Sequence, residues 1–503
     1  MKPRILHFVC GLLAVLALPG SAAVEPAPVA AAAPGGPKAA PLTLVECIRR
    51  ALERGYTMAI QGYGPGIAAD SLVAARSTFK PTLSASASQS GNRTEDGTRS
   101  NGMNTSFSVS ERLPTGATVT FGTNLNRSAI NPAFSSLNPA YASDLSVSLQ
   151  QPLLQGAGSA INLAPIRRAE VGVDNAQRSY ESSALDTVLA TEDAYYQLAG
   201  TREHLAVVKA SLGLSERLLL EARTKAATGV ATRLDVLQAE VGLASSRQGV
   251  LQAENAVKAA EDALLALIGR FEFDQLLGPV QLVDAGAVSV PSVEASFALA
   301  KKNQPDFRTA QASLELAELD VAAAKDGLKP ALALDLAVGF NGNGASSNSA
   351  LGGSLARDNS SWQAGLSVSY PWGRSAEKAR LRQARAGLEQ QRLSVEQLEQ
   401  SILQRVRGAV RDIATNLEAV KIAALATQSS LQQYEVESAR FKSGLTTSRL
   451  VLFAQNDLEN ARVSELQARL NLQGSLANLR RIEGSTLQYY GLTLPAAAPD
   501  ERS

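Results

Sequence analysis

The sequence predicts a mainly α-helical fold that also contains a membrane β-barrel, with one unit of helix, strands and long helical hairpin present twice. Three observations predict this fold. Segments near the start of the chain match segments that lie about 250 residues later. Short runs alternate apolar and polar side chains, as strands with two different faces do. Long tracts rich in Ala, Leu, Gln, Glu and Arg have the composition of packed helices.

The N-terminus has the features of a secretory signal. A basic start precedes an apolar run from Ile5 to Leu18, and small residues follow up to Ala23. We therefore expect a signal peptide over 1–23 that directs the mature chain out of the cytosol. Residues 24–41 are rich in Pro and Ala and offer little to bury, so we expect a disordered spacer there.

The cysteines and the later apolar runs narrow the options further. Cys10 lies inside the signal and follows the bulky Val9, so lipid attachment to Cys10 is the less favoured alternative. Cys47 is alone in the mature chain, which predicts neither a disulfide framework nor a cysteine metal site. No later run approaches the ~20 apolar residues of a membrane-spanning helix, so any membrane crossing has to use strands.

An internal duplication sets the domain boundaries. The segment Leu72–Ala87 aligns with Val321–Leu336, and Gly229 aligns with Gly444. We expect a first structural repeat over 42–270, an inter-repeat equatorial segment over 271–290, a second repeat over 291–490 and a C-terminal tail over 491–503.

Strands are expected over about 82–152 and about 331–371, where apolar and polar residues alternate. The runs suggest four strands in the first half and two in the second, although a total of four strands also remains open. The polar segments Ser88–Asn104 and Asn341–Ser360 are expected to be long loops. Six strands are too few to close a water-filled barrel, so a barrel implies several chains that share one sheet.

Two helical hairpins account for the long proline-free tracts. We expect one hairpin over about 162–268 with its tip at Gly229, and one over about 376–485 with its tip at Gly444. Glycine tolerates the left-handed conformation that ends a helix. Thr232 and Thr447 follow the glycines and are expected to cap the returning helices, and Asp235 fits a capping box with Thr232.

The order of these motifs resembles the TolC-like outer membrane efflux protein family over essentially all of the mature chain. The motifs are the repeat starts "PLTLVECIRRALERGYTMAIQ" and "SFALAKKNQPDFRTAQ", the "FKP" and "LKP" segments before the strands, "QPLLQG", and both glycine breaks. The resemblance implies a homotrimer with a shared β-barrel among outer membrane lipid and a trimeric α-barrel tunnel in the periplasm. It also implies a passive exit duct of a tripartite efflux or type I secretion system, docked to a periplasmic adaptor (membrane fusion) protein and an inner-membrane transporter.

The resemblance also implies site residues. It places adaptor contacts at the two hairpin tips, which are Thr228, Gly229, Val230, Ala231, Ser443, Gly444, Leu445 and Thr446. Relatives narrow the periplasmic entrance with acidic residues at two positions that hold Leu450 and Phe453 here. These two side chains lie one helical turn apart, so they could form an apolar gate. The alternative is that both pack against a neighbouring helix.

Other classes of protein fit the sequence less well. The only histidines are His7, in the signal, and His204, and no phosphate-binding loop or metalloprotease motif is present, so we expect no enzyme, cofactor or metal site. The net charge of +1 gives no sign of nucleic-acid binding. The main alternative is a periplasmic coiled-coil structural or adaptor protein without a barrel. The cargo, which could be drugs, metal ions or secreted protein, stays open.

Overall fold

The computed structural model describes residues 42–131, 137–269, 278–280, 289–357 and 359–494. The signal peptide and spacer expected over 1–41 lie outside the described residues. So do most of the inter-repeat segment and the end of the C-terminal tail.

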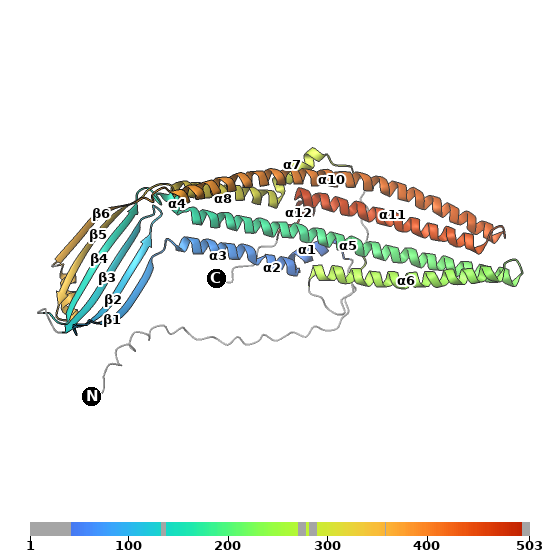
Figure 1. Cartoon of the computed structure of the whole chain (residues 1–503). Helices are drawn as coiled ribbons and strands as arrows, with labels where there is room; N and C mark the ends of the chain where they lie inside the picture. The colour runs from blue at the N-terminus through green and yellow to red at the C-terminus, as the bar shows by residue number, and fades with distance from the viewer. Residues whose placement is uncertain (1–41, 132–136, 270–277, 281–288, 358, 495–503) are drawn as a thin grey trace, which may run out of the picture. The chain divides into compact units, whose positions relative to one another are not determined.

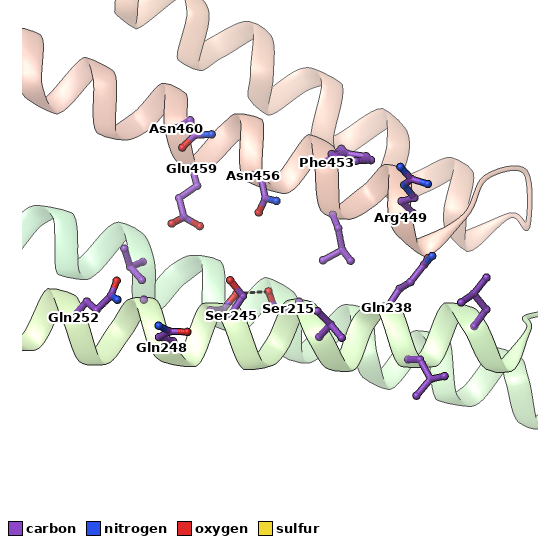
Figure 2. Close-up of a pocket in the computed structure, with 18 residues that line it drawn as sticks. Ser215, Gln238, Ser245, Gln248, Gln252, Arg449, Phe453, Asn456, Glu459 and Asn460 are labelled. Carbon is purple, nitrogen blue, oxygen red and sulfur yellow. Dashed lines mark hydrogen bonds between the residues drawn. The ribbon is translucent and has the colours of Figure 1, made fainter.

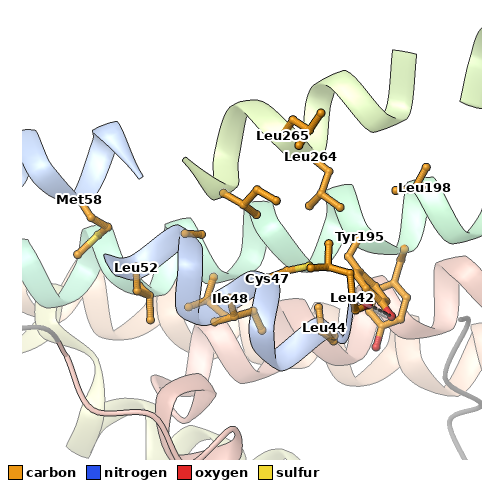
Figure 3. Close-up of a cluster of buried hydrophobic side chains, with 14 of the residues drawn as sticks. Leu42, Leu44, Cys47, Ile48, Leu52, Met58, Tyr195, Leu198, Leu264 and Leu265 are labelled. Atoms are coloured by element: carbon orange, nitrogen blue, oxygen red, sulfur yellow. Dashed lines mark hydrogen bonds between the residues drawn. The ribbon is translucent and has the colours of Figure 1, made fainter. Parts of the chain in front are cut away.

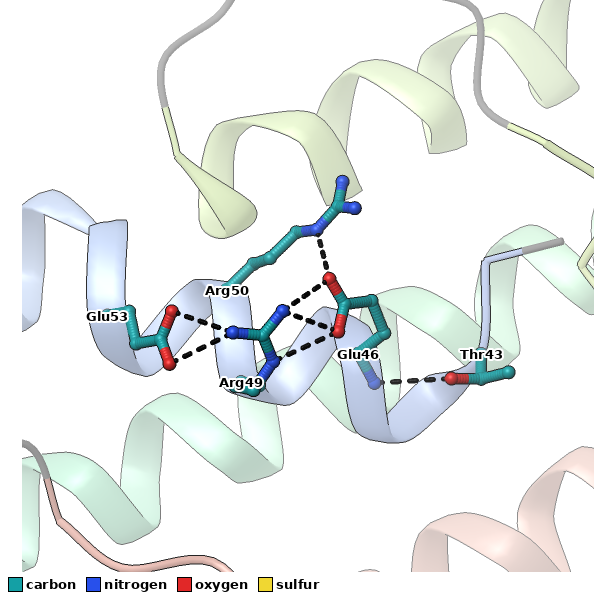
Figure 4. Close-up of polar contacts among 5 residues, drawn as sticks. All are labelled: Thr43, Glu46, Arg49, Arg50 and Glu53. Atoms are coloured by element: carbon teal, nitrogen blue, oxygen red, sulfur yellow. Dashed lines mark hydrogen bonds and ion pairs between the residues drawn. The ribbon is translucent and has the colours of Figure 1, made fainter. Parts of the chain in front are cut away.

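Three helices precede the sheet: α1 (Leu44–Arg54), α2 (Tyr56–Gln61) and α3 (Tyr63–Ser77). The Thr43 hydroxyl caps α1 by accepting a hydrogen bond from the Glu46 amide at 3.3 Å. Figure 4 shows the outer side of α1, where the Glu46 carboxylate bonds both Arg49 and Arg50. The inner side of α1 is apolar, and this asymmetry fixes which side of α1 packs against the rest of the fold.

The inner side of α1 joins a buried cluster with α5 and α6 (Figure 3). Ile48, Leu198 and Leu264 are fully buried in this cluster. Cys47 is buried among them, and burial raises the pKa of its thiol to about 12, so this cysteine is an inert part of the core.

A single antiparallel sheet has the strand order β1-β2-β3-β4-β5-β6. Four strands come from the first half and two from the second, and together with the helices they confirm the predicted fold class. The strands are β1 (Thr82–Arg93), β2 (Arg99–Arg112), β3 (Thr118–Asn131), β4 (Ala140–Pro152), β5 (Ala331–Gly344) and β6 (Asn359–Ser369). The two repeats meet within the sheet, because β4 of the first repeat pairs with β5 of the second and Leu149 lies opposite Leu336.

The register gives the sheet one apolar face and one polar face. Cross-strand partners share a face, so Val109, Phe121, Val147, Val338 and Trp362 form one row across β2 to β6. The residues next to them in each strand, such as Ser108, Ser146 and Gly339, lie on the other face. We call the two sides the apolar face and the polar face. An alternation this regular, with apolar side chains left exposed, is typical of strands that meet lipid on one side.

Two loop predictions were wrong. The segment Ser88–Asn104 is mostly strand, because β1 and β2 continue their hydrogen-bonded ladder through Ser, Gly and Asn residues up to the pair Arg93 and Arg99. The segment Asn341–Ser360 contains the ends of β5 and β6 and a helix, α9 (Ser347–Ala356). Backbone pairing and a cap at Ser346 set these elements, and neither leaves an apolar pattern in the sequence.

Helices form the rest of the described fold. After the short α4 (Ser159–Asn162) they are α5 (Ala164–Ala227), α6 (Arg233–Ile268), α7 (Val293–Asn303), α8 (Pro305–Asp326), α10 (Ser375–Lys442), α11 (Ser448–Glu483) and α12 (Thr486–Tyr489). Helices α5 and α6 pair as one hairpin, and α10 and α11 pair as the other (Figure 1). Among the described helices, none has a stretch long and apolar enough to cross a bilayer.

Candidate functional site

The hairpin tips end their first helices in the same way. Gly229 has φ 73° and Gly444 has φ 74°, a conformation that favours glycine. The amide of Val230 donates to the Lys225 carbonyl at 2.9 Å, and the amide of Leu445 donates to the Arg440 carbonyl at 2.9 Å. These bonds across the glycine make both ends Schellman motifs, so the glycines are built into the turns.

The two returning helices begin differently. The Thr232 hydroxyl accepts from the Asp235 amide at 3.2 Å and the Asp235 carboxylate accepts from the Thr232 amide at 3.0 Å, so the predicted capping box is present. The predicted cap at Thr447 is wrong as a side-chain cap. Thr447 lies at the N-cap of α11, but the Leu450 amide bonds its backbone carbonyl at 3.2 Å. A capping box is also not possible here, because Leu450 stands at the position that the acid Asp235 holds in α6.

Polar contacts tie one tip to the other. The Ser448 hydroxyl bonds the Asp235 carboxylate at 3.1 Å, and the Lys225 ammonium contacts the Phe441 carbonyl while lying 4.1 Å from the centre of the Phe441 ring. Hydrogen bonds from the Thr232 side chain, more than any other contact, lower the pKa of Asp235 below its ordinary value. Asp235 therefore stays charged and joins the start of α6 to the start of α11.

The outer ends of the tips are exposed and partly apolar. Of the predicted contact residues, Val230 is 66% exposed and Leu445 is 71% exposed. Thr228, Gly229, Ser443 and Gly444 are also exposed, while Ala231 and Thr446 are half-buried. The fold thus brings the eight predicted tip residues to one end of the paired hairpins.

A groove of about 950 Å³ lies between α6 and α11 behind the tips (Figure 2). Phe453 lines it and Arg449 stacks over the Phe453 ring at 5.3 Å. Gln238 of α6 lies opposite Arg449, and Gln248 lines the groove farther from the tips, below Asn456. Leu450 is 48% exposed and does not line the groove. The two predicted gate residues are therefore both exposed, but only Phe453 faces the groove.

Gln455 is a buried contact that the sequence did not single out. Its amide donates to the Ser211 carbonyl at 2.8 Å and to the Ser215 hydroxyl at 2.7 Å, which fastens α11 to α5. The sequence feature that could have indicated it is a glutamine next to the apolar heptad positions of α11, which include Val451 and Leu458. Spacing alone did not reveal its partners, which lie about 240 positions earlier.

A buried ion pair joins the same two helices farther from the tips. Arg480 of α11 lies 3.2 Å from the fully buried Glu192 carboxylate of α5. The Arg480 guanidinium also stacks on Tyr489, 4.2 Å from the ring centre. Burial raises the pKa of the Glu192 carboxyl, and the charge of Arg480 offsets only part of that effect.

No group of three or more His, Cys, Asp or Glu side chains within the described ranges is arranged to hold a metal ion. The polar contacts at the tips join helices to one another.

Proteins of known family and structure share this architecture. The sequence profile of the outer membrane efflux protein family matches residues 67–270 and 297–485. The outer membrane efflux protein BepC of Brucella suis is 24% identical over 368 residues, which cover 71% of this chain and 75% of BepC. Among solved structures, CusC superposes with a TM-score of 0.68 at 15% identity, covering 89% of this chain and 93% of CusC. The outer-membrane channel OprN gives 0.67 at 18% identity, with 88% and 89% covered.

The two structural likenesses show the fold, and the profile match covers most of both repeats. The chain therefore belongs to the outer membrane efflux protein family, whose members are transport channels of the outer membrane.

Proposed function

We propose that this chain is one subunit of a homotrimeric channel that acts as the passive exit duct of a tripartite efflux or type I secretion system. The observation that carries the proposal is the open, two-faced sheet. Strands β1 and β6 are its edges, so each has one side without a partner strand in the described chain. Three copies joined edge to edge would supply eighteen strands, a number that leaves an aqueous channel in known barrels.

The polar face suits the inside of such a channel. It carries Ser, Thr and Asn side chains, while the apolar face exposes large residues such as Trp362, which is 81% exposed. A closed sheet would turn the apolar face to lipid and satisfy the edge hydrogen bonds. This arrangement needs no chemistry from the chain, which fits a duct better than an enzyme.

The hairpin tips are the proposed docking site for a periplasmic adaptor, which in turn would engage an inner-membrane transporter. Exposed apolar residues at the tips, especially Val230 and Leu445, support this assignment because most of each side chain stays uncovered by the described part of the chain. The groove behind the tips gives a partner helix a place to lie.

Site-specific cross-linking tests the docking. Cysteines introduced by Val230→Cys or Leu445→Cys should cross-link to a periplasmic adaptor in intact cells. Leu393→Cys is the matched control, because Leu393 is 57% exposed and lies about 75 Å along α10 from the tip at the helical rise. Equal cross-linking at Leu393, or none at either tip, would overturn the assignment. Cys47 is buried and does not interfere.

Leu450 and Phe453 are proposed as an apolar gate near the tips. Each side chain is about half exposed in the single chain, so packing within the chain does not bury either of them. Three copies around an axis would form a collar that hinders ions by dewetting. No acid stands at these positions, so the collar offers no carboxylate to cations, and Arg449 beside Phe453 adds positive charge.

A further inference from the structure

Helix α9 lies directly on the sheet at the end far from the long helices. The Ser143 hydroxyl of β4 donates to the Ala350 carbonyl at 2.8 Å and bonds the Ser354 hydroxyl at 3.0 Å, and all three residues are buried. A Cβ at Gly342 of β5 would lie 1.9 Å from the Ala350 carbonyl oxygen and 2.5 Å from the Ser354 amide nitrogen. Only a glycine at this position lets the helix approach the strand so closely.

The register shows which face α9 covers. Ser143 pairs with Gly342, and two residues farther along each strand Leu145 pairs with Phe340. Residues two apart in a strand point to the same side. The loop between β5 and β6 thus folds back over the apolar face, and leaves the polar face open.

Arginines flank α9 on this face. Arg127 of β3 donates from Nε to the Tyr141 hydroxyl at 3.2 Å, and Tyr141 pairs with Gly344 at the start of the loop that holds α9. Arg357 follows the C-terminal end of α9, and its guanidinium lies 5.5 Å from the centre of the Phe340 ring. Neither arginine makes an ion pair with any described residue.

Acidic side chains in the strands do not balance these charges. The strands contain three acids in all, of which Asp144 and Asp335 alternate onto the polar face and Glu111 lies at the opposite end of β2. Asp96, in the turn between β1 and β2, accepts hydrogen bonds from Thr98 within its own turn. Glu95 also lies in that turn, beyond the ends of β1 and β2. Among the described strand residues, the outer end of the apolar face therefore carries Arg127 and no acid.

Apolar surface continues from α9 toward the middle of the strands. Leu355 of α9 is 70% exposed, and Val338 and Trp362, below it on the same face, are 55% and 81% exposed. A guanidinium binds phosphate oxygens with two parallel hydrogen bonds, and an exposed apolar band accepts acyl chains. A molecule that matches both has a phosphate head and a hydrocarbon tail.

We propose that α9, Arg127 and Arg357 form a binding site for a phosphate-bearing lipid of the outer leaflet. The proposal rests on the proposed function in one respect, because it requires the apolar face to meet the membrane. Helix α9 covers the glycine-rich end of β5 and sets the level of the headgroups. The arginines hold the phosphate and the strands below hold the acyl chains.

Lipid retention by the purified full-length trimer tests the site. Native mass spectrometry would count the molecules of diphosphoryl lipid A retained in detergent, with the dephosphorylated lipid and inorganic phosphate as comparison probes. We expect retention of the phosphorylated lipid to fall about tenfold in Arg127→Gln plus Arg357→Gln. The pair Arg308→Gln plus Arg382→Gln removes the same charge from helices α8 and α10 and should leave retention unchanged.

A second variant moves the helix and keeps both arginines. Gly342→Val should displace α9 and reduce retention, while Gly365→Val on β6, where a Cβ has open space, should not. The proposal would be overturned if the Arg127/Arg357 variant retained as much lipid as wild type, or if the Arg308/Arg382 control lost as much as that variant. It would also be overturned if the dephosphorylated lipid bound as well as the phosphorylated one, or if inorganic phosphate displaced the lipid completely.

Single-channel conductance measured on the same samples separates this proposal from the channel function. A wild-type trimer that conducts, together with unchanged lipid retention in the arginine variant, sinks only the lipid site. A trimer that does not conduct even when Leu450 and Phe453 are replaced with alanine contradicts the channel function itself.

Discussion

Replacing Arg480 with methionine should destabilise the subunit strongly. The substitution leaves the Glu192 carboxylate, which is fully buried, without the guanidinium that lies 3.2 Å away. It also removes the stacking of Arg480 on Tyr489. Breaking one side of a buried pair costs about 3–5 kcal/mol, because the remaining charge stays in an apolar setting.

The neighbouring Arg481 provides a matched control. Arg481 pairs with Asp186 at 2.6 Å, but Asp186 is 63% exposed. Water can replace the arginine there, so Arg481→Met should cost only about 0–1 kcal/mol. The two variants change the same residue type at adjacent positions in α11, and they differ in the burial of the partner carboxylate.

Thermal unfolding of the detergent-extracted protein, followed by circular dichroism at one protein concentration, measures both effects. The double variant Glu192→Met plus Arg480→Met should recover most of the loss, since it leaves no unpaired charge. Equal destabilisation by Arg480→Met and Arg481→Met, or a double variant as unstable as Arg480→Met alone, would refute the reasoning.

The pH dependence of the same pair has a definite sign. Burial raises the folded-state pKa of Glu192 above its ordinary value of 4.5, so the folded protein binds this proton more tightly than the unfolded chain does. The resulting stabilisation is complete below pH 4.5 and is lost as the pH rises through the folded pKa. Wild type should therefore lose stability relative to the Glu192/Arg480 double methionine variant as the pH rises above 4.5 and through the folded-state pKa. A stability difference that stays constant with pH would contradict this assignment.

Two further predictions concern the tips. Gly444→Val should lower the free energy of unfolding by about 1–3 kcal/mol and abolish adaptor cross-linking, because a β-branched residue is strained at φ 74°. Gly474→Val, at a position in α11 where a Cβ has open space, should keep cross-linking. Normal efflux and cross-linking in Gly444→Val would show the assignment to be wrong. Leu450→Ala plus Phe453→Ala should raise single-channel conductance and antibiotic sensitivity, and unchanged values for both would rule out the gate.

The sequence predicted those parts of the fold that repeat a pattern along the chain. Alternation over Leu145, Val147 and Leu149 correctly indicated a strand with two different faces, and the glycines at 229 and 444 marked the helix ends. The capping box at Thr232 followed from local spacing and is present. These features depend on residues within one or two turns of each other, so periodicity reveals them.

Features set by distant partners could not be predicted in this way. Helix α9 has Gly and Ser in place of an apolar stripe, and its position depends on Ser143, which is more than 200 residues earlier. The Gln455 contact and the Glu192 pair likewise join α5 to α11 across the duplication. At Thr447 the threonine matched the local cap pattern, but a backbone carbonyl took the bond instead.

Electrical recording from the purified protein in a planar lipid bilayer tests the central claim most directly. A trimeric channel predicts discrete, long-lived conductance steps of uniform size, carried by a species whose mass in detergent equals three mature chains. A protein that remains a monomer, or trimers that leave the bilayer insulating even when Leu450 and Phe453 are replaced with alanine, would contradict the account.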